Sequence, residues 1–315
     1  MDVISDDCYP DPNDPESFRA SAFSRDLMRS FKPDVPWILM EQATNALNWR
    51  PTNAPKAPGQ MQAISMQAVA RGADGVLFFQ WRQSRAGSEK FHSAMLPQAG
   101  TNTRTWREVT ALGADLAALP PLPAGARDAR VALVFDWQNW WAISNPGHPT
   151  VLDYPALVQG WYSALHRQHV QVDIVQPGSD LSGYRVVIAP QQYLLTADDA
   201  ANLLNFVENG GHLLVTAFSD IVDENDAFRD GGYLTQLGDA LGIWLEDFGA
   251  LVAADGAAAT ADSAGAATVA SAVAGAVAGA GGPGQAFAPL SSPLGEVTGT
   301  LLAEEIHLAG ATRRA

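Results

Sequence analysis

Apolar residues in the first third of the chain alternate between helical spacing and short continuous runs. Residues 17–31 repeat their apolar positions at helical spacing and predict a helix, as do residues 60–71 and 105–119. Two uninterrupted apolar runs lie between these segments, at residues 37–40 and 75–81, and such runs are typical of strands buried on both faces. The order helix, strand, helix, strand, helix predicts a parallel α/β sheet or barrel.

A second series of apolar runs and helical patterns follows a Pro-rich stretch at residues 121–127, which we interpret as a linker. Thr196 is placed to cap one of the predicted helices. Strands that alternate with helices in this way are typical of an open doubly wound sheet of the flavodoxin type. The predicted strands are residues 131–135, 170–175, 185–189 and 212–217, and the predicted helices are residues 153–168 and 196–209.

The chain therefore divides into two predicted α/β domains, residues 1–120 and residues 128–312. Residues 252–284 interrupt the second domain with a run made mostly of Ala and Gly. This composition has no pattern that would pack a core, so we predict a flexible low-complexity insertion. Residues 264–280, the most membrane-like part of the chain, are shorter than the roughly 20 residues that a spanning helix needs, and we predict no membrane span.

Composition narrows the possible partners and the compartment. The 315 residues carry a formal net charge of −15, which disfavours binding to nucleic acid or to an anionic membrane surface. A single cysteine, Cys8, excludes an intrachain disulfide and a Cys-rich zinc site, and the acidic N-terminus does not resemble a signal peptide. We therefore expect a cytoplasmic protein without a structural metal or cofactor. The cysteine count also excludes a Cys-dependent amidotransferase in the second domain.

Glu41 is the strongest candidate for a catalytic residue. It ends the apolar run at residues 37–40, and functional side chains of an α/β barrel project from the carboxyl ends of the strands. The plainer alternative is an acidic residue that begins a loop, and the pattern leaves both open. Three further candidates lie later in the same predicted domain, at Trp49, Glu89 and His92. Aromatic faces together with hydrogen-bonding side chains are the combination that binds sugars.

Five short motifs recur in a fixed order over residues 1–120. They are Leu39-Met40-Glu41-Gln42, Asn48-Trp49-Arg50, Ala70-Arg71-Gly72-Ala73-Asp74-Gly75, Phe79-Gln80-Trp81-Arg82-Gln83 and Gly87-Ser88-Glu89-Lys90-Phe91-His92. This series resembles the family 42 glycoside hydrolases, which are microbial β-galactosidases. Residues 128–250 and 290–312 resemble the amidotransferase-like trimerisation domain that follows the barrel in that family. The resemblance implies the end of a (β/α)8 TIM barrel followed by that domain.

The resemblance also implies a function and roles for individual residues. Glu41 would be the nucleophile of a retaining β-galactosidase, and Trp49, Glu89 and His92 would surround the galactose. Such an enzyme needs two carboxyl groups about 5–5.5 Å apart. The expected partners are a β-galactoside substrate and two further copies of the chain in a homotrimer. Tryptophans suit subunit contacts or the core of the second domain equally well, and the candidates are Trp137, Trp140, Trp141 and Trp161.

The chain departs from the family pattern in its first domain. The acid/base of the family is a Glu preceded by Asn, and this chain contains no Asn-Glu pair. It supplies only two full barrel strands, with residues 3–6 as the end of a third, whereas a closed barrel has eight. We therefore expect residues 1–120 to be the C-terminal part of a longer enzyme. The alternative is a non-catalytic oligomerisation module or an inactive fragment.

Overall fold

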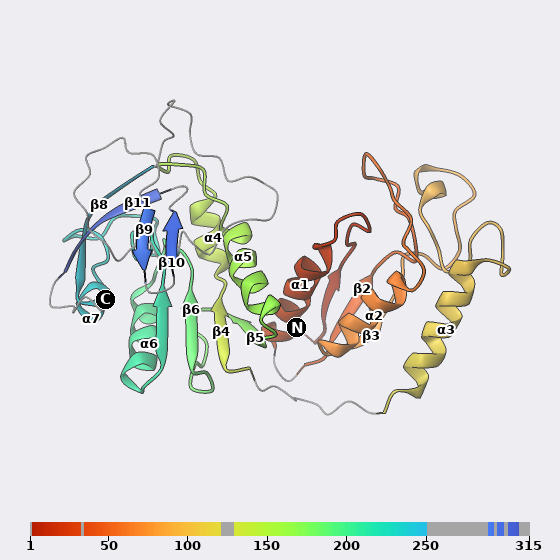
Figure 1. Ribbon diagram of the computed structural model, residues 1–315, viewed down its shortest axis with the longest axis horizontal. Coiled ribbons are helices and arrows are strands. Elements are labelled where there is room, and N and C mark those ends of the chain that lie inside the picture. Colours follow the sequence, from red (N-terminus) through yellow and green to blue (C-terminus); the bar gives the residue numbers. More distant parts are fainter. Residues whose placement is uncertain are drawn as a thin grey trace. The chain divides into compact units, whose positions relative to one another are not determined.

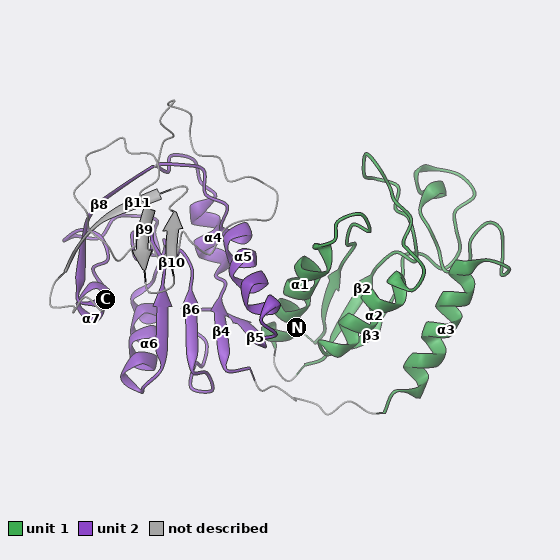
Figure 2. Cartoon of the chain, viewed as in Figure 1, with its two compact units in different colours: residues 1–128 green, residues 129–315 purple. Residues whose placement is uncertain are grey.

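The computed structural model describes residues 2–32, 35–120 and 129–250, together with the backbone of three later strands, 289–292, 295–298 and 302–308. The chain forms two compact units, residues 1–128 and residues 129–315, called here the N-terminal and C-terminal units (Figure 2). The predicted linker and the predicted Ala/Gly insertion lie outside the described residues. No helix among the described residues is long and apolar enough to cross a membrane.

The N-terminal unit is a parallel three-stranded sheet with its helices between successive strands (Figure 1). The strands lie in the order β1-β2-β3. Each crossover from one strand to the next contains a helix, as in a β/α barrel. The elements in chain order are β1 (Ile4–Asp7), α1 (Ser17–Phe31), β2 (Trp37–Glu41), α2 (Gln60–Ala70), β3 (Ala73–Val76), the 3-10 helix η1 (Ser88–Phe91) and α3 (Arg104–Ala118).

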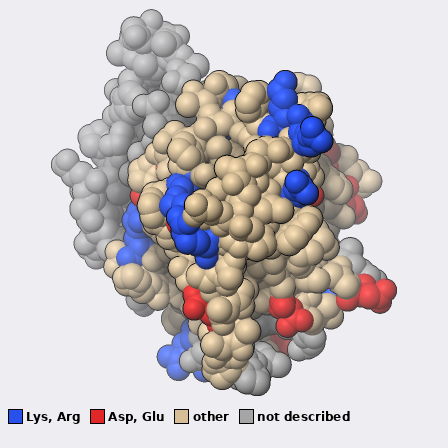
Figure 3. All heavy atoms as spheres, turned by 90° about the vertical axis from the view of Figure 1, so that its right-hand side faces the viewer, with Lys and Arg blue, Asp and Glu red and all other residues tan. Residues whose placement is uncertain are grey.

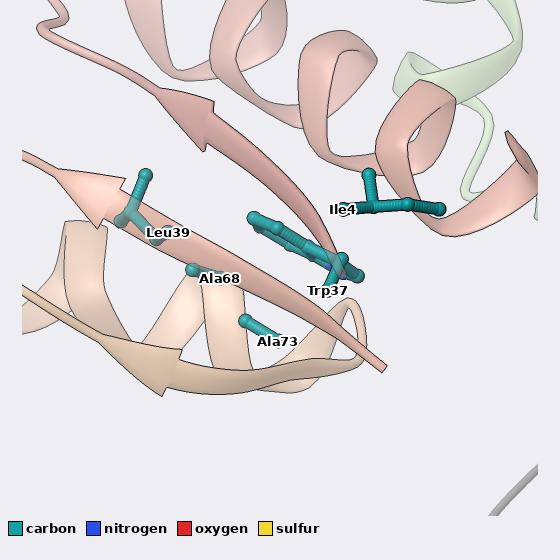
Figure 4. Close-up of a cluster of buried hydrophobic side chains, with 5 residues drawn as sticks. All are labelled: Ile4, Trp37, Leu39, Ala68 and Ala73. Atoms are coloured by element: carbon teal, nitrogen blue, oxygen red, sulfur yellow. The ribbon is translucent and has the colours of Figure 1, made fainter. Parts of the chain in front are cut away.

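One face of this sheet packs against the helices. Trp37 and Leu39 of β2 are buried with Ile4 of β1, Ala68 of α2 and Ala73 of β3 (Figure 4). The indole nitrogen of Trp37 donates a hydrogen bond to the backbone oxygen of Arg71 at 3.2 Å. Met40, on the opposite face of β2, is 39% exposed. In the described residues β2 is therefore buried on one face, whereas its continuous apolar sequence predicts burial on both.

The strand predicted over residues 75–81 is shorter and begins earlier, because β3 spans only Ala73–Val76. Beyond it the backbone still donates from Leu77 to Leu39 at 2.8 Å and from Phe79 to Gln42 at 3.1 Å. The step from Leu77 to Phe79 is two residues, whereas the step between their partners, Leu39 and Gln42, is three. The regular pairing register is therefore lost. The peptide bond between Phe79 and Gln80 is cis. The prediction was wrong for residues 77–81, which form an irregular segment beside the end of β2.

The C-terminal unit contains a parallel four-stranded sheet in the order β5-β4-β6-β7. This is the order of a flavodoxin-like doubly wound sheet, so the predicted α/β class is confirmed. Thr196 caps α6 as predicted, because its side chain accepts a hydrogen bond from the amide of Asp199. The elements are β4 (Val131–Val134), α4 (Trp137–Ile143), α5 (Tyr154–Arg167), β5 (Val172–Val175), β6 (Val186–Ala189), α6 (Ala197–Glu208) and β7 (His212–Val215).

The sequence did not predict α4, a seven-residue helix capped by Asp136. Of the four tryptophans that suited either core or interface, Trp161 is buried and Trp141 is 64% exposed. The other two pack beside Phe135, with ring centroids 5.2 Å from it for Trp137 and 5.9 Å for Trp140. Trp141 is therefore the most exposed of the four, and Trp137 and Trp140 are partly buried.

Short elements follow the main sheet of this unit. The helix α7 (Gly238–Leu241) leads into β8 (Ile243–Ala250), which pairs antiparallel with β11 (Leu302–Leu308). β9 (Pro289–Ser292) and β10 (Gly295–Thr298) form a separate antiparallel pair. On the face of the molecule drawn in Figure 3, Lys and Arg side chains lie in separate groups divided by uncharged residues. Basic charge on that face is therefore not gathered into one patch.

Candidate active site

Glu41 lies at the carboxyl end of β2, where the sheet fixes its backbone. The backbone oxygen of Glu41 accepts a hydrogen bond from the amide of Cys8 at 2.9 Å, which joins it to the end of β1. Its half-buried carboxylate accepts a second bond at Oε2 from the hydroxyl of Tyr9, at 2.6 Å. Among the described residues no hydrogen bond is made to Oε1. One carboxylate oxygen is thus held while the other is available.

Tyr9 is a site residue that the sequence reasoning missed. Burial, followed by the hydrogen bond to Glu41 and the negative charges nearby, raises the pKa of Tyr9 well above its ordinary value. The phenol therefore stays protonated and acts only as a donor toward Glu41. Arg50 holds the segment in place, because its guanidinium donates to the backbone oxygen of Tyr9. The sequence offered only one indication that Tyr9 belongs to the site, which is its position just after the strand that neighbours β2.

Trp49 and His92 form an aromatic cluster with Tyr9 and Phe79. The edge of Tyr9 meets Trp49 with ring centroids 4.9 Å apart, and Trp49 and His92 are 5.3 Å apart. Phe79 meets His92 edge-on at 4.9 Å. Trp49 is nevertheless 54% exposed, so much of this indole remains open to a ligand. The structure therefore brings two of the predicted sugar-binding residues into contact.

The imidazole of His92 is buried and held by one hydrogen bond. Its Nδ1 lies 2.8 Å from the backbone oxygen of Ser93. A carbonyl oxygen can only accept, so Nδ1 carries the proton and, in the neutral ring, Nε2 is left as an acceptor. In the described part of the chain this buried Nε2 has no hydrogen-bond partner. Because the side chain is fully buried, this acceptor lies inside the protein and is not open to a ligand in the described residues.

Glu89 lies in η1 and is tied to the loop that carries Trp49. The side-chain amide of Asn48 donates to Glu89 Oε2 at 2.9 Å and to the backbone oxygen of Ser88 at 2.8 Å. Asn48 thereby connects the segment after β2 with the segment after β3. It was part of a sequence motif but was not singled out as a site residue.

The site is electrostatically negative. Asp7 pairs in register with Glu41, and burial followed by the charge of Glu41 raises the pKa of the Asp7 carboxyl. The charges of Glu41, Asp7 and Glu89 all act on the Tyr9 phenol. A negative environment of this kind stabilises positive charge that develops on a bound molecule. Among the described residues no group of three His, Cys, Asp or Glu side chains is placed to hold a metal ion.

Two family models match the chain. The first, described as β-galactosidase, matches residues 1–119, and the second, described as the β-galactosidase trimerisation domain, matches residues 129–281. The chain belongs to glycoside hydrolase family 42. This family 42 chain is similar to the β-galactosidase BgaB of Geobacillus sp. (strain Y412MC61), with 48% identity over 250 residues that cover 79% of this chain and 37% of that protein. A β-galactosidase of Arthrobacter sp. is 45% identical over 254 residues, which cover 80% of this chain and 37% of that protein.

Solved structures of family 42 enzymes agree with the fold. The β-galactosidase of Bacillus circulans sp. alkalophilus superimposes with a TM-score of 0.82 at 34% identity, covering 99% of this chain and 43% of that one. The cold-adapted β-galactosidase of Rahnella sp. R3 gives a TM-score of 0.81 at 34% identity, with the same coverage. The family 42 chain thus spans about 37% of the length of the curated relatives it matches.

Proposed function

We propose that this family 42 chain supplies the nucleophile-bearing part of a retaining β-galactosidase, with Glu41 as the nucleophile. The observation that carries the proposal is the strand-end carboxylate held at Oε2 by the Tyr9 hydroxyl at 2.6 Å. With that oxygen engaged, Oε1 is the atom that attacks. A carboxylate with a fixed orientation and one available oxygen is what covalent glycoside hydrolysis requires.

The proposed reaction proceeds in two steps on a terminal β-D-galactose. In the first, Oε1 of Glu41 forms a bond to the anomeric carbon while the bond to the leaving-group oxygen breaks, and a second carboxyl group protonates that oxygen. In the second, the same group removes a proton from water, which attacks the anomeric carbon and releases Glu41 as a carboxylate. The second carboxyl group is not assigned to any residue of this chain, whose sequence lacks the Asn-Glu pair.

The sugar would be held by the groups around Glu41. The exposed indole of Trp49 offers a flat apolar face for the C–H surface of the ring. The Glu89 oxygen that Asn48 does not engage would accept a hydrogen bond from a sugar hydroxyl. His92 is buried with its ring centroid 5.3 Å from that of Trp49, and it would support this indole. The neighbouring carboxylates would stabilise the positive charge that develops on the ring in the transition state.

Substitution of Glu41 in the complete enzyme tests the assignment. Glu41→Gln should remove nearly all turnover of an aryl β-galactoside, whereas Glu16→Gln, an equal change at the exposed residue that precedes α1, should leave turnover unchanged. Azide added to Glu41→Ala should restore release of the aryl group and yield the α-galactosyl azide, because azide enters from the face that Glu41 vacates. Turnover of Glu41→Gln within tenfold of the parent would exclude Glu41 as the nucleophile.

The C-terminal unit would assemble the enzyme as a homotrimer, since the model it matches is described as a trimerisation domain. The alternative function, a non-catalytic assembly module, is favoured by the three barrel strands in the described N-terminal unit, since a closed barrel needs eight. Assays on the purified chain distinguish the galactosidase from the assembly module. Oligomers without galactoside hydrolysis support assembly alone, and hydrolysis that Glu41→Gln abolishes rejects it.

A further inference from the structure

Lys56 is a buried ammonium that the proposed reaction does not use. Only 4% of the residue is exposed, and Nζ donates to the backbone oxygens of Ala43 at 2.8 Å and Asn45 at 3.1 Å. In the described part of the chain Nζ has no carboxylate partner, and the charge with the largest effect on it is the like charge of Arg50. Burial and, after it, Arg50 lower the pKa of Lys56 to about 8. A charge buried at this cost needs a reason beyond filling space.

The two carbonyls that Lys56 binds lie in the segment between Glu41 and Trp49. Ala43 is two residues beyond Glu41, and Asn45 is four residues before Trp49. Asn45 is held a second time, because its side-chain oxygen accepts from the Lys56 amide at 2.7 Å. The segment has no regular secondary structure of its own, so these bonds take the place of a sheet ladder.

From Asn45 the contacts continue to His92. The amide of Asn45 donates to the hydroxyl of Ser93 at 2.9 Å, and the amide of Ser93 donates back to Ala46 at 3.0 Å. The backbone oxygen of Ser93 in turn accepts from His92 Nδ1. Lys56 therefore anchors one continuous network that joins the loop after β2 to the loop after β3.

We propose that Lys56 is a positioning residue for the hydrolysis, which fixes segment 43–46 and thereby sets Trp49 and His92 relative to Glu41. This inference rests on the proposed function of the site. Lys56 touches neither substrate nor the reacting atoms. Its effect is on the geometry of the residues that do, and a displacement of about 1 Å in such residues can cost about a hundredfold in rate.

The test is a double-mutant cycle on kcat/KM in the complete enzyme. Lys56→Met keeps an unbranched side chain that is one atom shorter and removes both hydrogen bonds of Nζ, and Ser93→Ala removes the acceptor of the Asn45 amide. Each should lower kcat/KM for an aryl β-galactoside by about tenfold to a hundredfold. Because both act through the same segment, the double variant should lose little more than the worse single variant. The inhibition constant of a non-hydrolysable thiogalactoside should rise in parallel.

Leu112→Ala is the matched control for a loss of stability alone. Leu112 is buried in a cluster with Met61 and Val109 that includes no residue of segment 43–46, so this variant should melt at a lower temperature with kcat/KM unchanged. A lower melting temperature of Lys56→Met with kcat/KM within twofold of the parent would overturn the proposal. A double variant whose loss of kcat/KM equals the product of the two single losses would also overturn the proposal.

A variant that does not fold and a failure of the proposed role of Glu41 can each be told apart from a failure of the Lys56 proposal. If Lys56→Met does not fold, Ser93→Ala alone decides, and kcat/KM of that variant within twofold of the parent overturns the proposal. If the parent hydrolyses galactosides and Glu41→Gln does too, the proposed role of Glu41 fails instead, irrespective of Lys56.

Discussion

Tyr9→Phe is the substitution that most directly probes how Glu41, the proposed nucleophile, is held. It removes one hydroxyl, whose oxygen lies 2.6 Å from Glu41 Oε2. The ring remains, and with it the edge contact to Trp49 at 4.9 Å. The change therefore deletes a single hydrogen bond to the carboxylate without opening a large cavity.

The two steps of the reaction respond differently to this loss. In the first step Glu41 changes from a charged carboxylate to a neutral ester, so the bond from Tyr9 weakens as the reaction proceeds. In the second step negative charge returns to Glu41, and the same bond strengthens. Without Tyr9, breakdown of the galactosyl-enzyme should therefore slow more than its formation.

The size of the effect follows from the kind of bond. A hydrogen bond to a charged group contributes about 1.5–3 kcal/mol. If the bond is fully regained as Glu41 leaves, its loss corresponds to a decrease of about 10-fold to 150-fold in the second step. An activated aryl galactoside makes that step limiting for kcat, whereas kcat/KM reports the first step. We expect kcat to decrease within that range and kcat/KM to decrease several-fold less.

Rapid mixing with a nitrophenyl β-galactoside measures both steps. Tyr9→Phe should give a burst of nitrophenol followed by a slower steady state, and intact-protein mass spectrometry should detect a galactosyl adduct. Tyr184→Phe is the control, because Tyr184 also donates to a carboxylate, Asp173, at 3.1 Å but lies in the C-terminal unit. A decrease in kcat/KM equal to or larger than that in kcat, without a burst, would refute the reasoning.

Three further predictions concern stability. Leu112→Ala should lower the free energy of unfolding by about 2–5 kcal/mol, measured by urea denaturation, because it empties part of a buried cluster. Thr196→Ala should cost about 1 kcal/mol in the same assay through loss of the α6 cap. Between about pH 8 and 10.5 the folded chain binds fewer protons at Lys56 than the unfolded chain. The unfolding free energy of the parent should therefore rise relative to that of Lys56→Met across this window, by up to about 3 kcal/mol, and equal pH dependence of the two proteins would contradict the lowered pKa.

Elements with a regular apolar period were predictable from the sequence. The helix predicted over residues 17–31 is α1, with the predicted bounds. Its buried residues include Arg25 and Asp26, whereas Phe18 and Phe31 are exposed, so the apolar spacing predicted the helix but not its packed face. The helix α4 was missed because seven residues rich in tryptophan show no helical period. The strand predicted over residues 75–81 was wrong for residues 77–81, because a shift in backbone register after Val76, which the side-chain pattern does not encode, ends the regular pairing.

The same distinction separates the site residues that the sequence revealed from those it did not. Glu41 was predictable because the strand before it determines where it lies. Tyr9, Asn48 and Lys56 act through contacts between loops that follow different strands, and no local pattern records such contacts. The sheet therefore fixes the position of the proposed nucleophile, and the loops fix the orientation of the groups around it. It follows that loop substitutions such as Tyr9→Phe should alter the balance of the two steps with little loss of stability, whereas the core substitution Leu112→Ala should do the reverse.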